Sequence, residues 1–161
     1  MSPASFFDYP NESPASSGKV DQLLADASEE EWATLLKHTI YRRYGPGDPV
    51  VTAGARDQSL YLVLEGQLEV LVERGRRGHR RIASIGAGSV IGELSFFDGE
   101  ARSALVRAVT PAVLAELSPA EFDSLAVSNP ALARRLLFDL GRILAQRLRA
   151  VQRTESMAGA T

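Results

Sequence analysis

Residues 60–74, LYLVLEGQLEVLVER, contain two short β-rich runs, Leu60–Glu65 and Gln67–Arg74, joined at the dipeptide Glu65-Gly66. Here the apolar residues change from a helical period of about 3.6 to a period of about 2, which is typical of strands. A glycine between two such runs supplies the positive φ that a tight turn needs. The stretch therefore predicts a β-hairpin and places strands, not helices, in the middle of the chain.

The same pattern continues on both sides of this hairpin, with turn residues such as Gly45-Pro46-Gly47-Asp48 and Gly86-Ala87-Gly88 recurring about every 8–12 residues. The expected strands are Thr39–Tyr44, Pro49–Thr52, Leu60–Glu65, Gln67–Arg74, His79–Ile85, Val90–Ile91, Ser103–Ala108 and Ala112–Leu117. Short strands at this spacing are typical of a barrel or a double-sheet jelly roll. We therefore expect an eight-stranded antiparallel β-roll over residues 39–117.

Helical patterns lie before and after the predicted strands. Over residues 19–37, Ser28 and Glu31 form a capping box, so one short helix should end near Asp26 and a second should begin at Ser28.

Two helices are expected after the roll. Pro119 suits the first turn of a helix over residues 119–127, and Asn129-Pro130 caps and starts a longer helix that reaches about Arg153. The fold class is therefore α+β, an antiparallel β-roll flanked by short N-terminal helices and two C-terminal helices.

The composition limits the possible functions. A length of 161 residues suggests one domain, here residues 19–153, between a flexible arm (1–18) and a frayed tail (154–161). A net charge of −2 gives no overall attraction to DNA, and the absence of cysteine excludes disulfides and thiol chemistry. With no apolar run of bilayer length, no signal sequence and no spaced histidines, we expect a cytoplasmic protein without membrane, metal or enzymatic function.

The stretch most informative about function is residues 91–104, IGELSFFDGEARSA. Gly92 allows a tight turn from a strand into a short helix and a close approach of the backbone to a ligand. The amides of Glu93, Leu94 and Ser95 can then point together at an anion. This turn predicts a cradle for a phosphate group.

Three side chains of the stretch extend this interpretation. Arg102 offers a planar fork of donors suited to phosphate oxygens, and Ser103 adds a hydroxyl. Glu93 would repel a phosphate, so it suits the site only if it accepts a hydrogen bond from another group of the ligand, such as a ribose hydroxyl. The alternative is an ordinary set of turns with a surface pair between Glu93 and Arg102.

These residues resemble the phosphate-binding cassette of the cyclic-nucleotide-binding family, in which Gly-Glu-Leu is followed by Arg and then Ser, Thr or Ala. The similarity to the bacterial catabolite-activator branch extends over residues 20–153. It includes Gly45-x-Gly47-Asp48, residues 60–66, Gly88 and Asn129-Pro130.

The resemblance implies a role for each residue of the cassette. Glu93 would bind the ribose 2′-hydroxyl, and Arg102 and Ser103 would bind the cyclic phosphate. Backbone amides at Gly92, Glu93 and Leu94 would complete the cradle. Val70 and Ile82 match family positions that pack against the base.

The sequence departs from the family pattern near the base. Ala101 replaces a frequent proline, and Arg147-Leu148 and Ile143 replace residues of the long helix that are polar in the activator branch. Arg147 would cap the base by stacking or hydrogen bonding, as arginines do in channel-type relatives. Ser103 matches the choice that accepts cAMP, so cAMP is the expected ligand and cGMP the alternative.

The long helix also carries a stripe at the spacing of a coiled-coil seam. Its residues are Ala133, Leu137, Leu140, Leu144, Arg147 and Val151. We expect a parallel homodimer through this seam, with Leu132, Leu136 and Ile143 facing the roll. The alternative is that every apolar position packs on the chain's own roll.

Three functions stay open. The leading hypothesis is a cyclic-nucleotide sensor that signals through its C-terminal helix to an unknown protein partner. The sequence has no DNA-reading helix after Arg153, so no DNA binding is expected of this chain alone. The alternatives are the ligand-binding half of a Crp/Fnr-like transcription regulator and an interaction module that binds no nucleotide.

Overall fold

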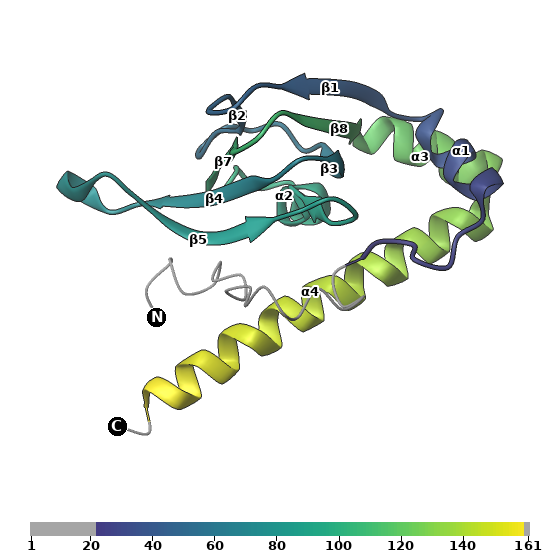
Figure 1. Ribbon diagram of the computed structural model, residues 1–161. Helices are drawn as coiled ribbons and strands as arrows, with labels where there is room; N and C mark the ends of the chain where they lie inside the picture. Colours follow the sequence, from purple (N-terminus) through teal and green to yellow (C-terminus); the bar gives the residue numbers. More distant parts are fainter. Residues whose placement is uncertain (1–21, 160–161) are drawn as a thin grey trace.

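The computed structural model describes residues 22–159 (Figure 1). The predicted arm, residues 1–18, lies outside this range. In chain order the elements are α1 (Glu29–Leu36), β1 (Ile40–Tyr44), β2 (Pro49–Val51), β3 (Leu60–Glu65), β4 (Leu68–Glu73), the 3₁₀ turn η3 (Gly75–Arg77), β5 (His79–Ile85), β6 (Val90–Ile91), α2 (Glu93–Asp98), β7 (Leu105–Ala108), β8 (Ala112–Leu117), α3 (Pro119–Ser128) and α4 (Pro130–Ala158). The predicted α+β fold, an antiparallel β-roll with flanking helices, is confirmed.

Two four-stranded sheets form the roll. Their strand orders are β1-β8-β3-β6 and β2-β7-β4-β5, and all neighbouring strands are antiparallel. The hairpin β4–β5 carries η3 at its tip and projects beyond the rest of the roll (Figure 1).

Strand β3 separates the two hydrophobic cores of the molecule. Tyr61 and Val63 belong to the core between the sheets, whereas Leu60 and Leu62 belong to the core between the roll and the helices. Successive side chains of a strand point to opposite faces, so both faces of β3 are buried over Leu60–Val63, and the strand is apolar up to its exposed last residue, Glu65.

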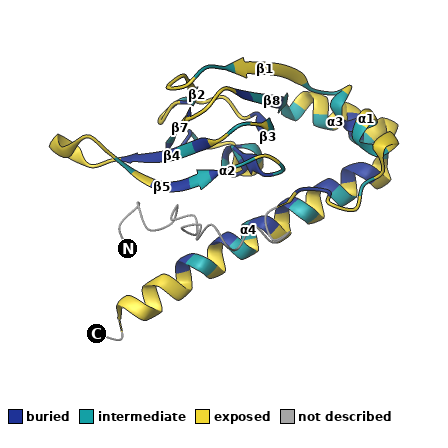
Figure 2. Cartoon of the chain, in the orientation of Figure 1, coloured by how far each residue is buried: buried dark blue, intermediate teal, exposed yellow. Residues whose placement is uncertain are grey.

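Helix α4 runs along the roll and buries one stripe of its surface (Figures 1 and 2). Asn129 caps it by accepting a hydrogen bond of 3.2 Å from the amide of Leu132. The stripe contains Leu132, Ala133, Leu136, Leu140, Ile143, Arg147 and Val151. The predicted contact of Leu132, Leu136 and Ile143 with the rest of the chain is confirmed, and the helix continues to Ala158, past the predicted end at Arg153.

The predicted seam of α4 is wrong for four of its positions. Ala133, Leu140, Arg147 and Val151 are buried within the single chain and offer no free face to a second copy. The large apolar side chains that α4 exposes are Leu137, Phe138, Leu148 and Met157.

The N-terminal segment differs from the prediction. The capping box of α1 is present, with Ser28 and Glu31 bonded in both directions. The helix expected to end near Asp26 is absent from its described part, residues 22–26, where Leu24 has a φ of 49°. The amide of Leu23 instead donates to the carbonyl of Gly88, and that of Leu24 to Asp139 of α4, so the chain turns here.

No helix within residues 22–159 is both long and apolar enough to cross a bilayer.

Candidate functional site

Gly92 forms the turn between β6 and α2 in the left-handed conformation, with a φ of 79°. A Cβ at this position would lie 2.6 Å from Nη1 of Arg102 and 2.8 Å from the carbonyl oxygen of Ser59. Both the backbone angle and the space therefore require glycine.

The turn opens onto a narrow cavity of about 30 Å³. All six predicted cassette residues and Val70 contribute to its wall. The lining consists of Val51, Val70, Ile91, Gly92, Glu93, Leu94, Ser95, Arg102, Ser103, Ala104 and Val106. Ile82 belongs to the same core as Val70 but does not line the cavity.

Arg102 is fixed by three acceptors. Its Nη1 donates to the carbonyl of Gly92 at 2.9 Å, and its Nη2 donates to the carbonyl of Ser59 and to Oδ2 of Asp57, both at 2.6 Å. The guanidinium also lies 5.9 Å from the ring centre of Tyr61. Burial raises the pKa of Tyr61 to about 12, so this phenol stays neutral beside the cation at physiological pH.

Asp57 and Ser59, which hold the guanidinium, were not predicted. Both lie on the loop between β2 and β3, more than 40 residues before Arg102 in the sequence. Neither belongs to a recognisable motif, because an acid and a serine in a loop have many possible roles.

Glu93 begins α2 and is paired with Arg147 of α4. Nη1 of Arg147 donates to Oε1 of Glu93 at 2.8 Å, and the side chains are only 7% and 2% exposed. Nη2 of the same arginine donates to Oγ of Ser89 and to the carbonyl of Val90, both at 3.1 Å. Arg147, which we expected over the base, thus contacts the carboxylate expected to bind the ribose, and it does not line the cavity.

These groups define what the cavity can bind. It offers a buried guanidinium at Arg102, an exposed hydroxyl at Ser103 and a carboxylate at Glu93, beside the apolar side chains of Val51 and Val70. A carboxylate has about four acceptor positions, so Glu93 can bind Arg147 and a ligand hydroxyl together. The set suits a small ligand that combines an anion, a hydroxyl and an apolar ring.

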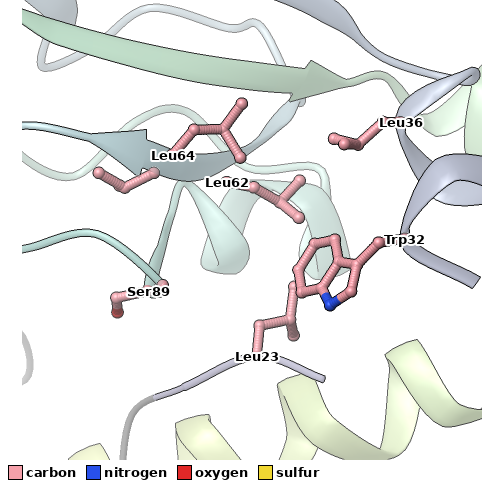
Figure 3. Close-up of a pocket in the computed structure, with 8 residues that line it drawn as sticks. Leu23, Trp32, Leu36, Leu62, Leu64 and Ser89 are labelled. Atoms are coloured by element: carbon pink, nitrogen blue, oxygen red, sulfur yellow. The ribbon is translucent and has the colours of Figure 1, made fainter. Parts of the chain in front are cut away.

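A second cavity of about 290 Å³ lies between α1 and β3 (Figure 3). It is lined by Leu23, Trp32, Leu36, Leu62, Val63, Leu64, Gly88 and Ser89. Only Ser89 of this lining has a hydroxyl and none is charged, so the cavity does not suit a phosphate. Within residues 22–159, no cluster of three or more His, Asp or Glu residues could hold a metal ion.

The sequence of the chain is similar to the sequences of known proteins. Residues 41–129 match the profile of the cyclic nucleotide-binding domain. The chain is 32% identical over 123 residues to the cAMP-activated global transcriptional regulator Vfr of Pseudomonas aeruginosa, covering 74% of this chain and 56% of Vfr. It is also 34% identical over 126 residues to Glutaminase 2 of Bradyrhizobium diazoefficiens, covering 78% of this chain but 19% of that protein.

The fold is similar to that of solved structures. For the crystal structure of a cyclic nucleotide-binding domain from Methylobacillus flagellatus, the TM-score is 0.74 at 30% identity, covering 87% of this chain and 78% of the other. For the Catabolite Activator Protein of Thermus thermophilus, the TM-score is 0.73 at 27% identity, covering 84% and 62%. The chain thus spans about a fifth of the length of Glutaminase 2 and just over half of the length of Vfr.

Proposed function

Because this chain belongs to the cyclic nucleotide-binding domain family, we propose that it binds cAMP in the cavity at the start of α2. The observation that carries the proposal is the meeting of Arg102, Glu93 and the Gly92 turn on one cavity wall. Arg102 and Ser103 bind the cyclic phosphate, together with backbone amides of residues 92–95. Glu93 accepts a hydrogen bond from the ribose 2′-hydroxyl, and Val70 packs against the base.

The small cavity bears on how the ligand enters. A space of about 30 Å³ holds no more than a few water molecules, so the surrounding side chains separate when a nucleotide binds. Binding therefore changes the packing around α2, which Glu93 connects to α4 through Arg147. This connection supports a sensor whose output is a change in α4.

Two broader roles fit this binding module. In the first, it acts on a protein partner through α4, as a pair of chains joined by the exposed leucines of that helix. In the second, it is the ligand-binding part of a transcription regulator, which the similarity to Vfr favours. The match to Glutaminase 2 covers only 19% of that protein and supports no glutaminase activity here.

Isothermal titration calorimetry with cAMP, cGMP and 5′-AMP tests the proposal. We expect one cAMP bound per chain, equal or weaker binding of cGMP, and much weaker binding of 5′-AMP, which lacks the cyclic phosphate. The absence of both heat and thermal stabilisation with cAMP and cGMP at millimolar concentration would disprove it.

A further inference from the structure

The hairpin of β4 and β5 ends in a dense group of arginines. Its tip, residues 73–81 (ERGRRGHRR), contains five arginines, one glutamate and one histidine, and no apolar side chain. Arg74, Arg76, Arg77 and Arg81 are exposed, and the tip projects beyond the rest of the roll (Figures 1 and 2). We propose that this tip binds the phosphate backbone of duplex DNA, at a site separate from the cyclic-nucleotide cavity.

The first argument is the uneven distribution of charge along the chain. Because five arginines outweigh one glutamate, the tip carries a net charge of +4 with histidine neutral, whereas the whole chain carries −2. The residues outside the tip therefore carry −6. The net charge of the chain, which gives no overall attraction to DNA, hides this separation. A polyanion is attracted to the tip and repelled by the rest of the molecule, so one localised contact is expected.

The second argument is that the exposed arginines of the tip are available to a partner. Within residues 22–159, none of these four arginines forms a salt bridge. Six arginines in the rest of that range are paired with carboxylates: Arg42, Arg102, Arg107, Arg135, Arg142 and Arg147. The planar fork of a guanidinium suits phosphate oxygens, and a carboxylate already bound to it would weaken that attraction.

The third argument is the shape of the tip. The amide of Arg74 donates a hydrogen bond of 2.7 Å to the carbonyl of Gly78, and the 3₁₀ turn η3 lies between them, so the turn has a defined structure. Arg74 follows β4 and Arg81 lies on β5, which places cations on both strands of the ribbon. A two-stranded ribbon fits the major groove of DNA, about 12 Å wide, where phosphates line both walls.

The composition of the tip argues against two other classes of partner. Protein interfaces generally bury aromatic or other apolar side chains at their centre, and residues 73–81 contain none. Segments that lie on a membrane surface insert such side chains at the boundary of the headgroups. A duplex requires only cations placed near its two rows of phosphates. Duplex DNA is therefore the partner that the tip fits best.

Fluorescence anisotropy with a labelled duplex of about two helical turns tests the site on the full chain without cAMP. Arg76→Gln combined with Arg77→Gln removes two charges from the tip. Arg149→Gln combined with Arg153→Gln, at exposed positions on α4, removes two charges elsewhere and is the matched control. All four side chains are exposed, so both double variants should melt at the temperature of the parent.

The parent should bind the duplex at low salt. If the tip neutralises about four phosphates, raising the salt from about 50 to about 200 mM should weaken binding about a hundredfold. The tip variant should bind at least about tenfold more weakly at low salt, and its salt slope should be smaller by about two. The control should bind the duplex like the parent.

Calorimetry with cAMP separates the tip from the cavity. Residues 73–81 do not line that cavity, so the tip variant should bind cAMP like the parent, and a parent that bound no cAMP would leave the result with DNA unaffected. If the parent does not bind the duplex at low salt, or if the control loses as much affinity as the tip variant, the tip is not a DNA site. Binding to vesicles of phosphatidylcholine and phosphatidylserine without binding to the duplex would also overturn the proposal, with a membrane as the partner.

Discussion

Oδ2 of Asp57 accepts a hydrogen bond of 2.6 Å from Nη2 of Arg102, so the cation assigned to the phosphate is already paired with a carboxylate. The side chain of Arg102 is 2% exposed and that of Asp57 is 46% exposed. The carbonyls of Gly92 and Ser59 also hold the guanidinium. Asp57 therefore lowers the positive potential at the cavity, while the backbone acceptors fix the direction of the arginine.

Asp57→Asn should strengthen cAMP binding. The substitution removes a negative charge near the phosphate, and the two carbonyls keep Arg102 in place. Because Asp57 is half exposed, the change should be modest, about two- to fivefold in Kd. Calorimetry at low salt measures it, and Asp98→Asn at the exposed end of α2 is the control. Weaker binding of Asp57→Asn would mean that Asp57 orients Arg102 and that the carbonyls do not suffice.

Arg102→Ala should lose more affinity than any other single substitution in the cassette. It removes the cation from the cavity and leaves the phosphate without its partner, which costs about 2–5 kcal/mol of binding free energy. Thermal melting must accompany the titration, because the same side chain binds Gly92, Ser59 and Asp57. Arg107→Ala on β7, which breaks a partly exposed pair with Glu69 on β4, should bind like the parent.

Glu93→Ala should reduce cAMP affinity less than Arg102→Ala but destabilise the fold more clearly. It removes one ribose contact and leaves the buried guanidinium of Arg147 without its carboxylate, a loss of about 3–5 kcal/mol in comparable buried pairs. Chemical denaturation measures the free energy of unfolding. If both Arg102→Ala and Glu93→Ala bound cAMP as tightly as the parent, the site would lie elsewhere.

The sequence predicts what is local in this site and misses what is distant. Residues 91–104 form one continuous motif, and the structure places Glu93 and Arg102 on one cavity. Ser89 accepts a hydrogen bond from Arg147, and Asp57 accepts one from Arg102, across 58 and 45 residues of sequence. Their role depends on the pairing of strands and the docking of α4, which no local pattern encodes.

The seam predicted on α4 is wrong at four positions for the same reason, because no local pattern encodes how the helix docks on the roll. Its period reveals a helix with apolar residues on more than one side, but not which side meets the roll. Only the packed structure shows that Leu140 faces inward whereas Leu137 is exposed. The strands were easier to predict, because glycine turns mark their ends in the sequence itself.

Gly92→Ala should destabilise the protein more than Gly47→Ala. Both glycines have positive φ, 79° and 86°, so each alanine suffers a backbone strain of about 1–2 kcal/mol. A Cβ at Gly47 meets nothing within 4 Å, whereas one at Gly92 would overlap Arg102 and Ser59. The difference between the two free energies of unfolding isolates the steric effect. Equal values would mean that the turn relaxes without disturbing Arg102.

The exposed apolar side chains of α4 predict that the chain forms a dimer through this helix. Leu137, Gly141, Leu144 and Leu148 follow one another at intervals of four, three and four residues, and Leu137 and Leu148 are exposed. A Cβ at Gly141 would touch nothing, so a second helix can approach closely there.

Replacing Leu137 and Leu148 together with glutamate should therefore convert a dimer into a monomer that still folds, because both side chains are partly exposed in the single chain. Sedimentation velocity at micromolar concentrations measures the change, with Val127→Glu on the exposed face of α3 as the control. Like charges facing each other across the seam would repel and prevent association. A parent that sediments as a monomer, with and without cAMP, would contradict the dimer. The output of α4 would then have to act within one chain or on a different protein.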